Sequence, residues 1–280
     1  MLSYLHAFHA GNFADVQKHA ALTLAVAMMQ VKPSGIAFVD THAGSALYDL
    51  DSERARKTAE ADAGIQKLWS SRDRLRSPDW QPMLGLLADQ NPGADRLKLY
   101  PGSPAWFRHL LRAEDALTTF ELHPSENRQL AEWAADRRIK AVQADGLAGM
   151  LKLLPPRQHR LLVLIDPSYE IKGDYAAVAA TLEKAWKKCR HGVFLIWYPI
   201  LTSGLQQTLL DQIRQGSVRK VLRSEVALAQ PPERGMTGSG MLVVNPPWGF
   251  DQRLLAMLAD VAQGPDGLGV DHRVDWLVPE

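Results

Sequence analysis

Short apolar runs recur along this chain, and between them apolar residues return at helical spacing. A short run without polar interruption is typical of a strand buried on both faces, as in parallel sheets. Strands that alternate with helices favour a doubly wound α/β sheet with right-handed crossovers. The pattern predicts seven strands, at residues 36–40, 117–121, 139–143, 161–165, 193–197, 218–229 and 240–245.

The last two predicted strands are joined only by a short glycine-rich segment, residues 235–239. Parallel neighbours need a crossover of roughly a dozen residues or more, whereas antiparallel neighbours need only a short loop. We therefore expect a mostly parallel sheet whose last strand runs antiparallel to its neighbour. Helices are expected at about 15–30 and 251–263, with a C-terminal tail after the second of these.

The connection between the first and second predicted strands is far longer than a crossover requires. Its central part is charged and has helical apolar spacing, for example at Ile65, Leu68, Met83 and Leu87. Since roughly a dozen residues would suffice, we expect a helical insertion there. The predicted organisation is one α/β domain formed by residues 1–50 and 99–280, with an insertion subdomain at 51–98.

Composition matters mainly for what it excludes. The 280 residues carry a formal net charge of +1, so a nucleic-acid partner would be held by local basic patches and not by a global field. A single cysteine, Cys189, excludes an internal disulfide and a cysteine-based zinc cluster. The longest apolar stretch, at about 20–29, is too short to cross a bilayer, and the N-terminus lacks signal-peptide features. We expect a cytoplasmic protein with no membrane partner.

The fourth predicted strand is followed by Asp166-Pro167-Ser168-Tyr169. Ligands of open parallel sheets bind at the carboxyl ends of strands. There the Asp166 carboxylate and the Pro167 carbonyl can accept the two hydrogens of an adenine amino group, which makes its nitrogen a better nucleophile. The Tyr169 ring can stack on an extruded base. The plain alternative is a common Asp-Pro turn at a strand end, and these four residues alone do not decide between the two.

Polar residues end three further predicted strands, at Asp40-Thr41-His42, Glu121 and Asp145. Each alone is more simply a solvated turn, but acids at neighbouring strand ends suit a nucleoside, whose ribose hydroxyls and amino group donate hydrogen bonds. The small residues up to Gly44 let a cofactor approach the backbone, and the dinucleotide fingerprint G-x-G-x-x-G is absent. The pattern favours S-adenosylmethionine over NAD, and an adenine methyltransferase that acts on nucleic acid.

Two rival interpretations concern other polar motifs. Asn245-Pro246-Pro247-Trp248 matches the amino-methyltransferase motif better as a string, but it follows the last strand, so we interpret it as a structural turn. The histidines, even with Asp15, show no recognised zinc spacing, and no metal is predicted. We expect His19 and His42 to be polar groups of the cofactor pocket, with buried hydrogen-bonded histidines as the plain alternative.

Motifs spread over the whole chain carry a family resemblance. They are Tyr4, His9-Ala10-Gly11-Asn12, Lys18-His19, Asp40-Thr41-His42-Ala43-Gly44, Tyr100-Pro101-Gly102-Ser103-Pro104, Glu121-Leu122-His123-Pro124, Ala144-Asp145-Gly146, Trp197-Tyr198-Pro199, Gly235-Met236-Thr237, Asn245-Pro246-Pro247-Trp248 and Trp276-Leu277-Val278-Pro279-Glu280. In these residues the chain resembles the RlmJ family, bacterial 23S ribosomal RNA adenine-N6 methyltransferases. The resemblance is far more specific than any single motif.

The resemblance implies a Rossmann-like S-adenosylmethionine-dependent methyltransferase fold with a small helical insertion. Asp166 would be the catalytic carboxylate, with Pro167 and Tyr169 beside it, and Tyr4, Lys18 and Tyr169 would contact the substrate. The implied partner is 23S ribosomal RNA, protein-free or partly assembled, with no obligate protein partner. The implied cofactor pocket, together with Gly44 of the small-residue turn, comprises His19, His42, Ser103, Glu121, Asp145, Gly146 and Asp166.

One position departs from the family's motif, which reads Asp-Pro-Pro-Tyr, because the third residue here is Ser168. A second proline would restrict Pro167 to extended conformations, so the loop should be looser in this chain. We expect reduced or retained activity. Two alternatives stay open: the same chemistry on DNA, or a nucleic-acid-binding protein that keeps the pocket with little turnover, since relatives are described as helping cells use external DNA.

Overall fold

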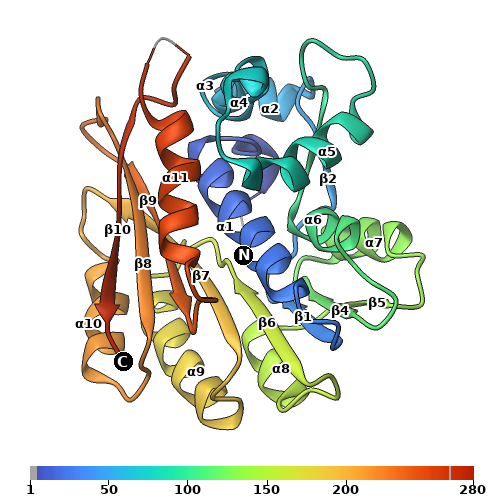
Figure 1. Cartoon of the computed structure of the whole chain (residues 1–280), viewed down its shortest axis with the longest axis vertical. Coiled ribbons are helices and arrows are strands. Elements are labelled where there is room, and N and C mark those ends of the chain that lie inside the picture. The colour runs from blue at the N-terminus through green and yellow to red at the C-terminus, as the bar shows by residue number, and fades with distance from the viewer. Residues whose placement is uncertain (1–4, 265) are drawn as a thin grey trace.

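The computed structural model describes residues 5–264 and 266–280 and is built around an eight-stranded sheet (Figure 1). The strands lie in the order β10-β8-β9-β7-β6-β1-β4-β5. β1, β4, β5, β6 and β7 run parallel, whereas β9 is antiparallel to both β7 and β8. The predicted Rossmann-like, mostly parallel sheet is confirmed. Its strands are β1 (Ile36–Asp40), β4 (Ala116–Phe120), β5 (Ile139–Val142), β6 (Arg160–Ile165), β7 (Val193–Leu201), β8 (Val221–Leu228), β9 (Met236–Val244) and β10 (Val270–Val278).

The predicted count of seven strands is wrong, because the expected C-terminal tail forms β10. This strand pairs antiparallel with β8 at the edge of the sheet. Its alternate residues include Asp271, Arg273 and Asp275, so the segment is too polar to read as a buried strand. Those charges pair across to β8: the Asp275 carboxylate accepts hydrogen bonds of 2.8 and 2.6 Å from Arg223. Charged side chains of this kind are common on edge strands.

The glycine-rich segment expected as a loop lies mostly inside β9. Residues 236–240 pair with β7 on one side, and 238–240 pair with β8 on the other. A side chain at Gly240 would meet the Tyr198 ring at about 2.1 Å, so the bulky residue on β7 explains the small one on β9. Gly238 and Gly240 make room within the sheet, whereas Gly235, with φ of 100°, stays in the loop before β9.

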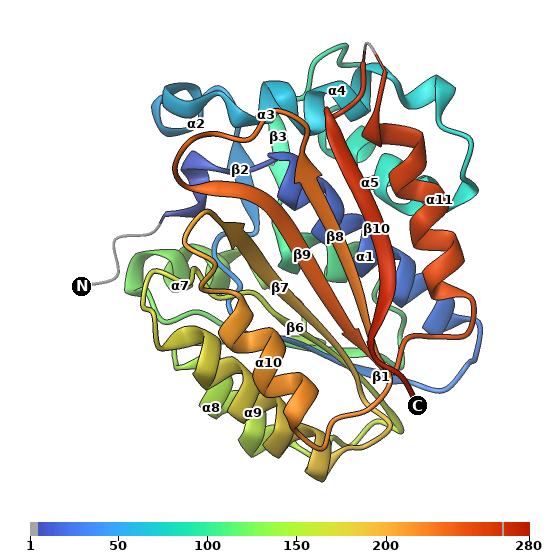
Figure 2. The same ribbon diagram turned by 90° about the vertical axis from the view of Figure 1, so that its left-hand side faces the viewer.

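Helices cover both faces of the sheet (Figure 2). On one face lie α8 (Gly146–Leu153), α9 (Asp174–Lys188) and α10 (Gln207–Gln215), and on the other lie α1 (Phe13–Gln30) and α11 (Phe250–Ala262). The short helix α6 (Ser103–His109) packs against α1, β1 and β4. A seventh helix, α7 (Pro124–Trp133), lies beside β5. The α1 helix starts two residues earlier than expected because Asn12 caps it, accepting a 2.9 Å hydrogen bond from the Asp15 N–H. Within the described residues no helix is long and apolar enough to span a bilayer.

The long connection after β1 contains the expected helices, at the top of Figure 1. Its entry and exit, β2 (Leu47–Asp49) and β3 (Leu99–Pro101), pair antiparallel and form the neck of the segment. The apolar residues of its helices share one hydrophobic core with α1. The subdomain division at 51–98 stays a prediction. The segment consists of α2 (Glu53–Thr58), α3 (Glu60–Ala63), α4 (Ile65–Ser70), α5 (Gln81–Gln90) and two 3-10 turns (Arg72–Arg74 and Pro78–Trp80).

Candidate functional site

A cavity of about 850 Å³ opens at the carboxyl ends of β1, β4, β5 and β6. Because these strands are parallel and adjacent, their last residues meet at one edge of the sheet. Tyr4 lies outside the described residues. Every other predicted site residue lines this cavity, namely Lys18, His19, His42, Gly44, Ser103, Glu121, Asp145, Gly146, Asp166, Pro167 and Tyr169.

One wall of the cavity is a backbone cradle after β1. Gly146 approaches this turn so closely that an added Cβ would lie 1.8 Å from the Thr41 carbonyl oxygen. The Glu121 carboxylate ties the cradle together, accepting hydrogen bonds from the N–H groups of Gly44 (2.8 Å) and His123 (2.7 Å). Asp145 caps α8 by accepting a 2.8 Å hydrogen bond from Ala148. The two acids keep further lone pairs for hydroxyl or amino donors of a nucleoside.

Two buried polar side chains at this wall have atoms without a partner among the described residues: His19, which lines the cavity, and Asp40, which directly precedes the lining residue Thr41. Both carboxylate oxygens of Asp40 are buried without a hydrogen bond to any described residue, as is Nε2 of His19. Nδ1 of His19 is 2.6 Å from the Tyr100 hydroxyl. Buried polar atoms without partners are rare in folded proteins, and a bound ligand or an ordered water would complete these. The residues present therefore fit a cofactor with cationic and hydroxyl groups.

Burial also sets the charges of this wall. It raises the pKa of the Asp40 carboxyl to about 7. It lowers the pKa of His42 to about 4 and holds that of His19 well below its usual range, so both imidazoles are neutral at physiological pH. Neutral histidines offer one donor and one acceptor each and do not repel a positively charged ligand.

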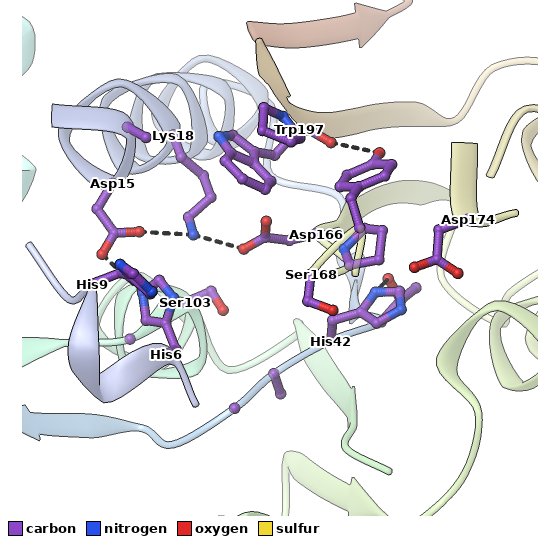
Figure 3. Close-up of a pocket in the computed structure, with 18 of the residues that line it drawn as sticks. His6, His9, Asp15, Lys18, His42, Ser103, Asp166, Ser168, Asp174 and Trp197 are labelled. Carbon is purple, nitrogen blue, oxygen red and sulfur yellow. Dashed lines mark hydrogen bonds and ion pairs between the residues drawn. The ribbon is translucent and has the colours of Figure 1, made fainter. Parts of the chain in front are cut away.

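The Asp166 carboxylate lies at the end of a chain of ionic contacts (Figure 3). Nε2 of His6 is 2.9 Å from Oδ2 of Asp15, whose Oδ1 lies 2.8 Å from the Lys18 ammonium. Nζ of Lys18 is 2.6 Å from Oδ2 of Asp166, and no described residue hydrogen-bonds to Oδ1 of Asp166. That oxygen, in a side chain only 13% exposed, is an acceptor open to a ligand.

The charges in this series of ionic contacts stabilise one another. Burial raises the pKa of Asp166, and the Lys18 ammonium opposes that shift. Burial also works against the charge of Lys18, but Asp15 and Asp166 outweigh it and raise its pKa above the usual range. For Asp15, burial is likewise outweighed, by His6 and Lys18, and its pKa lies well below the usual range. Lys18 is therefore a permanent cation between two carboxylates.

Tyr169 is held rigidly beside Asp166. Its backbone is left-handed, with φ of 54°, and its hydroxyl donates a 2.8 Å hydrogen bond to the Trp197 carbonyl. Its ring stacks on Tyr175 at 4.4 Å between centroids, so one ring face is already covered. The predicted stacking of Tyr169 on a base stays a prediction, and it would use the remaining face.

The rival motif, residues 245–248, lies at the other end of the strands, where the parallel strands begin. It follows the end of β9, where Val244 is paired with Phe194 near the start of β7. The Asn245 amide donates 2.8 Å hydrogen bonds to the carbonyls of Arg190 and Gly192, and Trp248 is 98% exposed. This segment closes a turn, as its place in the chain indicated, and no residue of it lines the cavity.

Sequence reasoning did not assign a role in this site to His6, Glu60 and Trp197, which also line the cavity. Asp15 carried one usable signal, since it lies three residues before Lys18 on a helix and such pairs face each other. The contacts of Glu60 join residues about fifty positions apart and have no local signature.

Known proteins resemble this chain over its whole length. Residues 33–278 match the family model described as "Ribosomal RNA large subunit methyltransferase D, RlmJ". Ribosomal RNA large subunit methyltransferase J of Escherichia coli K12 is 38% identical over 283 residues, and the protein of that name in Haemophilus influenzae is 37% identical over 284, with both chains covered completely in each case. A crystal structure of protein LPL1258 from Legionella pneumophila, 30% identical, superposes with a TM-score of 0.88 over 96% of this chain and 98% of its own.

Proposed function

Since this chain belongs to the RlmJ family of ribosomal RNA large subunit methyltransferases, we propose that it methylates N6 of an adenine in 23S ribosomal RNA with S-adenosylmethionine. The observation that carries the proposal is the open Oδ1 of Asp166, fixed by Lys18 at the mouth of a nucleoside-sized cavity. The substrate would be protein-free or partly assembled RNA in the cytoplasm.

The cofactor would occupy the cradle after β1. Nε2 of His19 and the Ser103 hydroxyl line the cavity and suit the methionine carboxylate. The buried carboxylate of Asp40, one residue before the lining residue Thr41, suits the methionine ammonium. Glu121 has free lone pairs that can accept hydrogen bonds from the ribose hydroxyls. Asp145 has free lone pairs that can accept hydrogen bonds from the adenine amino group. Bound there, S-adenosylmethionine supplies a methyl group on a positively charged sulfur.

The target adenine would enter beside Asp166. Its amino nitrogen is a weak nucleophile, because its lone pair is delocalised into the ring. Oδ1 of Asp166 and the Pro167 carbonyl accept its two hydrogens and favour a tetrahedral nitrogen whose lone pair points at the methyl group. Asp166 then takes the proton that the nitrogen loses. Before transfer, Lys18 opposes protonation of this carboxylate and holds it in place, and Tyr169 stacks on the base.

The test is radiolabelled methyl transfer from S-adenosylmethionine to protein-free 23S ribosomal RNA, beside single-stranded and duplex DNA. We expect label in RNA adenine, lowered about 10²- to 10³-fold in Asp166→Ala. Calorimetry should show that the variant still binds the cofactor, which separates loss of chemistry from loss of the pocket.

The other outcomes would each change the assignment. Label only in DNA would move the same chemistry to a DNA substrate. Cofactor binding without label in any nucleic acid would contradict an enzyme and support a nucleic-acid-binding role. Full activity of Asp166→Ala would show that another group activates the amino nitrogen.

A further inference from the structure

The insertion contacts the segment that precedes α1 through one carboxylate. Oε1 of Glu60, on α3, lies 2.9 Å from Nδ1 of His9, and Oε2 accepts a 2.9 Å hydrogen bond from the Asn12 amide. Nearby, the Thr58 hydroxyl donates to the Phe8 carbonyl. Both oxygens of one side chain thus hold two residues of the segment 8–12 against the insertion.

The backbones meet beside this carboxylate. The Ile65 N–H donates a 2.7 Å hydrogen bond to the Gly11 carbonyl. An added Cβ at Gly64 would lie 2.2 Å from that same oxygen, so only glycine permits this approach. The insertion is therefore seated on the segment 8–12 by main-chain contact, with Glu60 as the side chain that spans the junction.

The same segment organises the ionic contacts of the active site. Asn12 accepts from the N–H of Asp15, and the Gly11 N–H donates 2.8 Å to Oδ2 of Asp15. Asp15 holds Lys18, and Lys18 holds Asp166. Every step from Glu60 through Asn12, Asp15 and Lys18 to Asp166 is a hydrogen bond or ion pair in the structure. Figure 3 shows the contacts among Asp15, Lys18 and Asp166.

Stability does not explain this arrangement. The Glu60 and His9 side chains are 33% and 39% exposed, and ion pairs at such exposure contribute little to the free energy of unfolding. Glu60 nevertheless lines the cavity and reaches two residues about fifty positions earlier in the chain. These contacts suit a residue that positions the segment 8–12.

We propose that Glu60 is a positioning residue for methyl transfer: it fixes the segment 8–12 so that Asp15 and Lys18 hold Asp166 in its reactive geometry. The proposal rests on the proposed function. On this proposal the helical insertion contributes to catalysis, because a change at α3 alters the position of the catalytic carboxylate of Asp166.

Three variants test it: Glu60→Ala, Glu60→Gln and the matched control Glu53→Ala, which removes an exposed acid from α2 of the same insertion. We expect Glu60→Ala to lower kcat about tenfold, with KM for RNA and Kd for the cofactor within about twofold of wild type. Glu60→Gln keeps an amide oxygen for Asn12 and should recover part of the loss. Glu53→Ala should match wild type.

Hydrogen exchange of the peptide that spans residues 8–18 gives a readout independent of activity. It should be faster in Glu60→Ala than in wild type and unchanged in Glu53→Ala. Unchanged exchange in Glu60→Ala would overturn the proposal, and so would faster exchange with an unchanged kcat. An equal loss of kcat in Glu53→Ala would overturn it as well. If wild type methylates no RNA, the proposed function fails, and unaltered exchange in Glu60→Ala would then remove the positioning role as well.

Discussion

Asp40 should destabilise the protein without cofactor at neutral pH, and Asp40→Asn should reveal by how much. Burial raises the pKa of Asp40 to about 7, against about 3.9 for aspartate in an unfolded chain. Between these values the folded protein keeps a proton that the unfolded chain has lost, so the free energy of unfolding falls as pH rises from about 4 to about 7. Three pKa units at about 1.4 kcal/mol each set an upper bound of about 4 kcal/mol.

Asn has nearly the shape of the protonated acid and does not titrate. We would follow urea unfolding of wild type and Asp40→Asn from about pH 4 to about pH 8, without cofactor. Through this range the free energy of unfolding of the variant should rise relative to that of wild type by about 2–4 kcal/mol. The difference should level off above pH 7. A difference independent of pH would refute a protonated, buried Asp40.

The cofactor gives the second half of this test. If the ionised Asp40 carboxylate receives the methionine ammonium, the affinity of wild type for S-adenosylmethionine should rise from about pH 6 to about pH 8. Calorimetry of Asp40→Asn should show weaker binding at the upper pH and a flatter profile. Equal affinities of the two proteins at pH 8 would remove Asp40 from the cofactor site.

Two further predictions concern the motifs at opposite ends of the strands. Ser168→Pro should restrict Pro167 to extended conformations and raise kcat by about twofold or more at unchanged cofactor affinity; an unchanged kcat would show that stiffness here does not limit transfer. Trp248→Ala, at a side chain 98% exposed, should leave kcat within about twofold, whereas Tyr169→Ala should lower it about tenfold or more. A comparable loss in Trp248→Ala would restore the motif at 245–248 as the catalytic one.

The strand ends of the site could be predicted because one local rule links them. Uninterrupted apolar runs such as 161–165 identify parallel strands, and parallel strands bring Asp40, Glu121 and Asp166 to one edge. The fold class followed from the same runs. The rival motif was placed away from the cavity because it follows the last predicted strand, and the structure adds that this strand is antiparallel to β7, so that it ends where β7 begins.

The ionic contacts could not be predicted, because they depend on how α1 packs on the sheet. Lys18 and Asp166 are 148 positions apart, and nothing local marks them as partners. The strand β10 was missed for a related reason: Arg223 and Asp275 satisfy each other across the edge of the sheet, so a polar sequence forms a strand that its own composition does not favour. In both the Lys18–Asp166 contact and the strand β10, the structure depends on a partner far away in the sequence.

The charge of the cavity limits how RNA can approach it. Four acids, Asp15, Glu121, Asp145 and Asp166, line the cavity, and Lys18 forms ion pairs with Asp15 and Asp166. Such a pocket suits a cofactor with a sulfonium and an ammonium, but it repels phosphate. We therefore expect only the neutral base to enter, with the target adenine unstacked and its phosphates left outside.

The phosphates then need cations at the rim, since a net charge of +1 gives no global attraction. The α2 helix offers them. Arg54 and Lys57 are exposed, and Nζ of Lys57 lies 6.0 Å from the ring centre of Phe8, beside the residues that lead into the cavity. If α2 meets the RNA backbone, the contact is made by a helix that ends at Thr58, two residues before Glu60, which contacts the segment 8–12. RNA contact and active-site geometry would meet in one short stretch of the insertion.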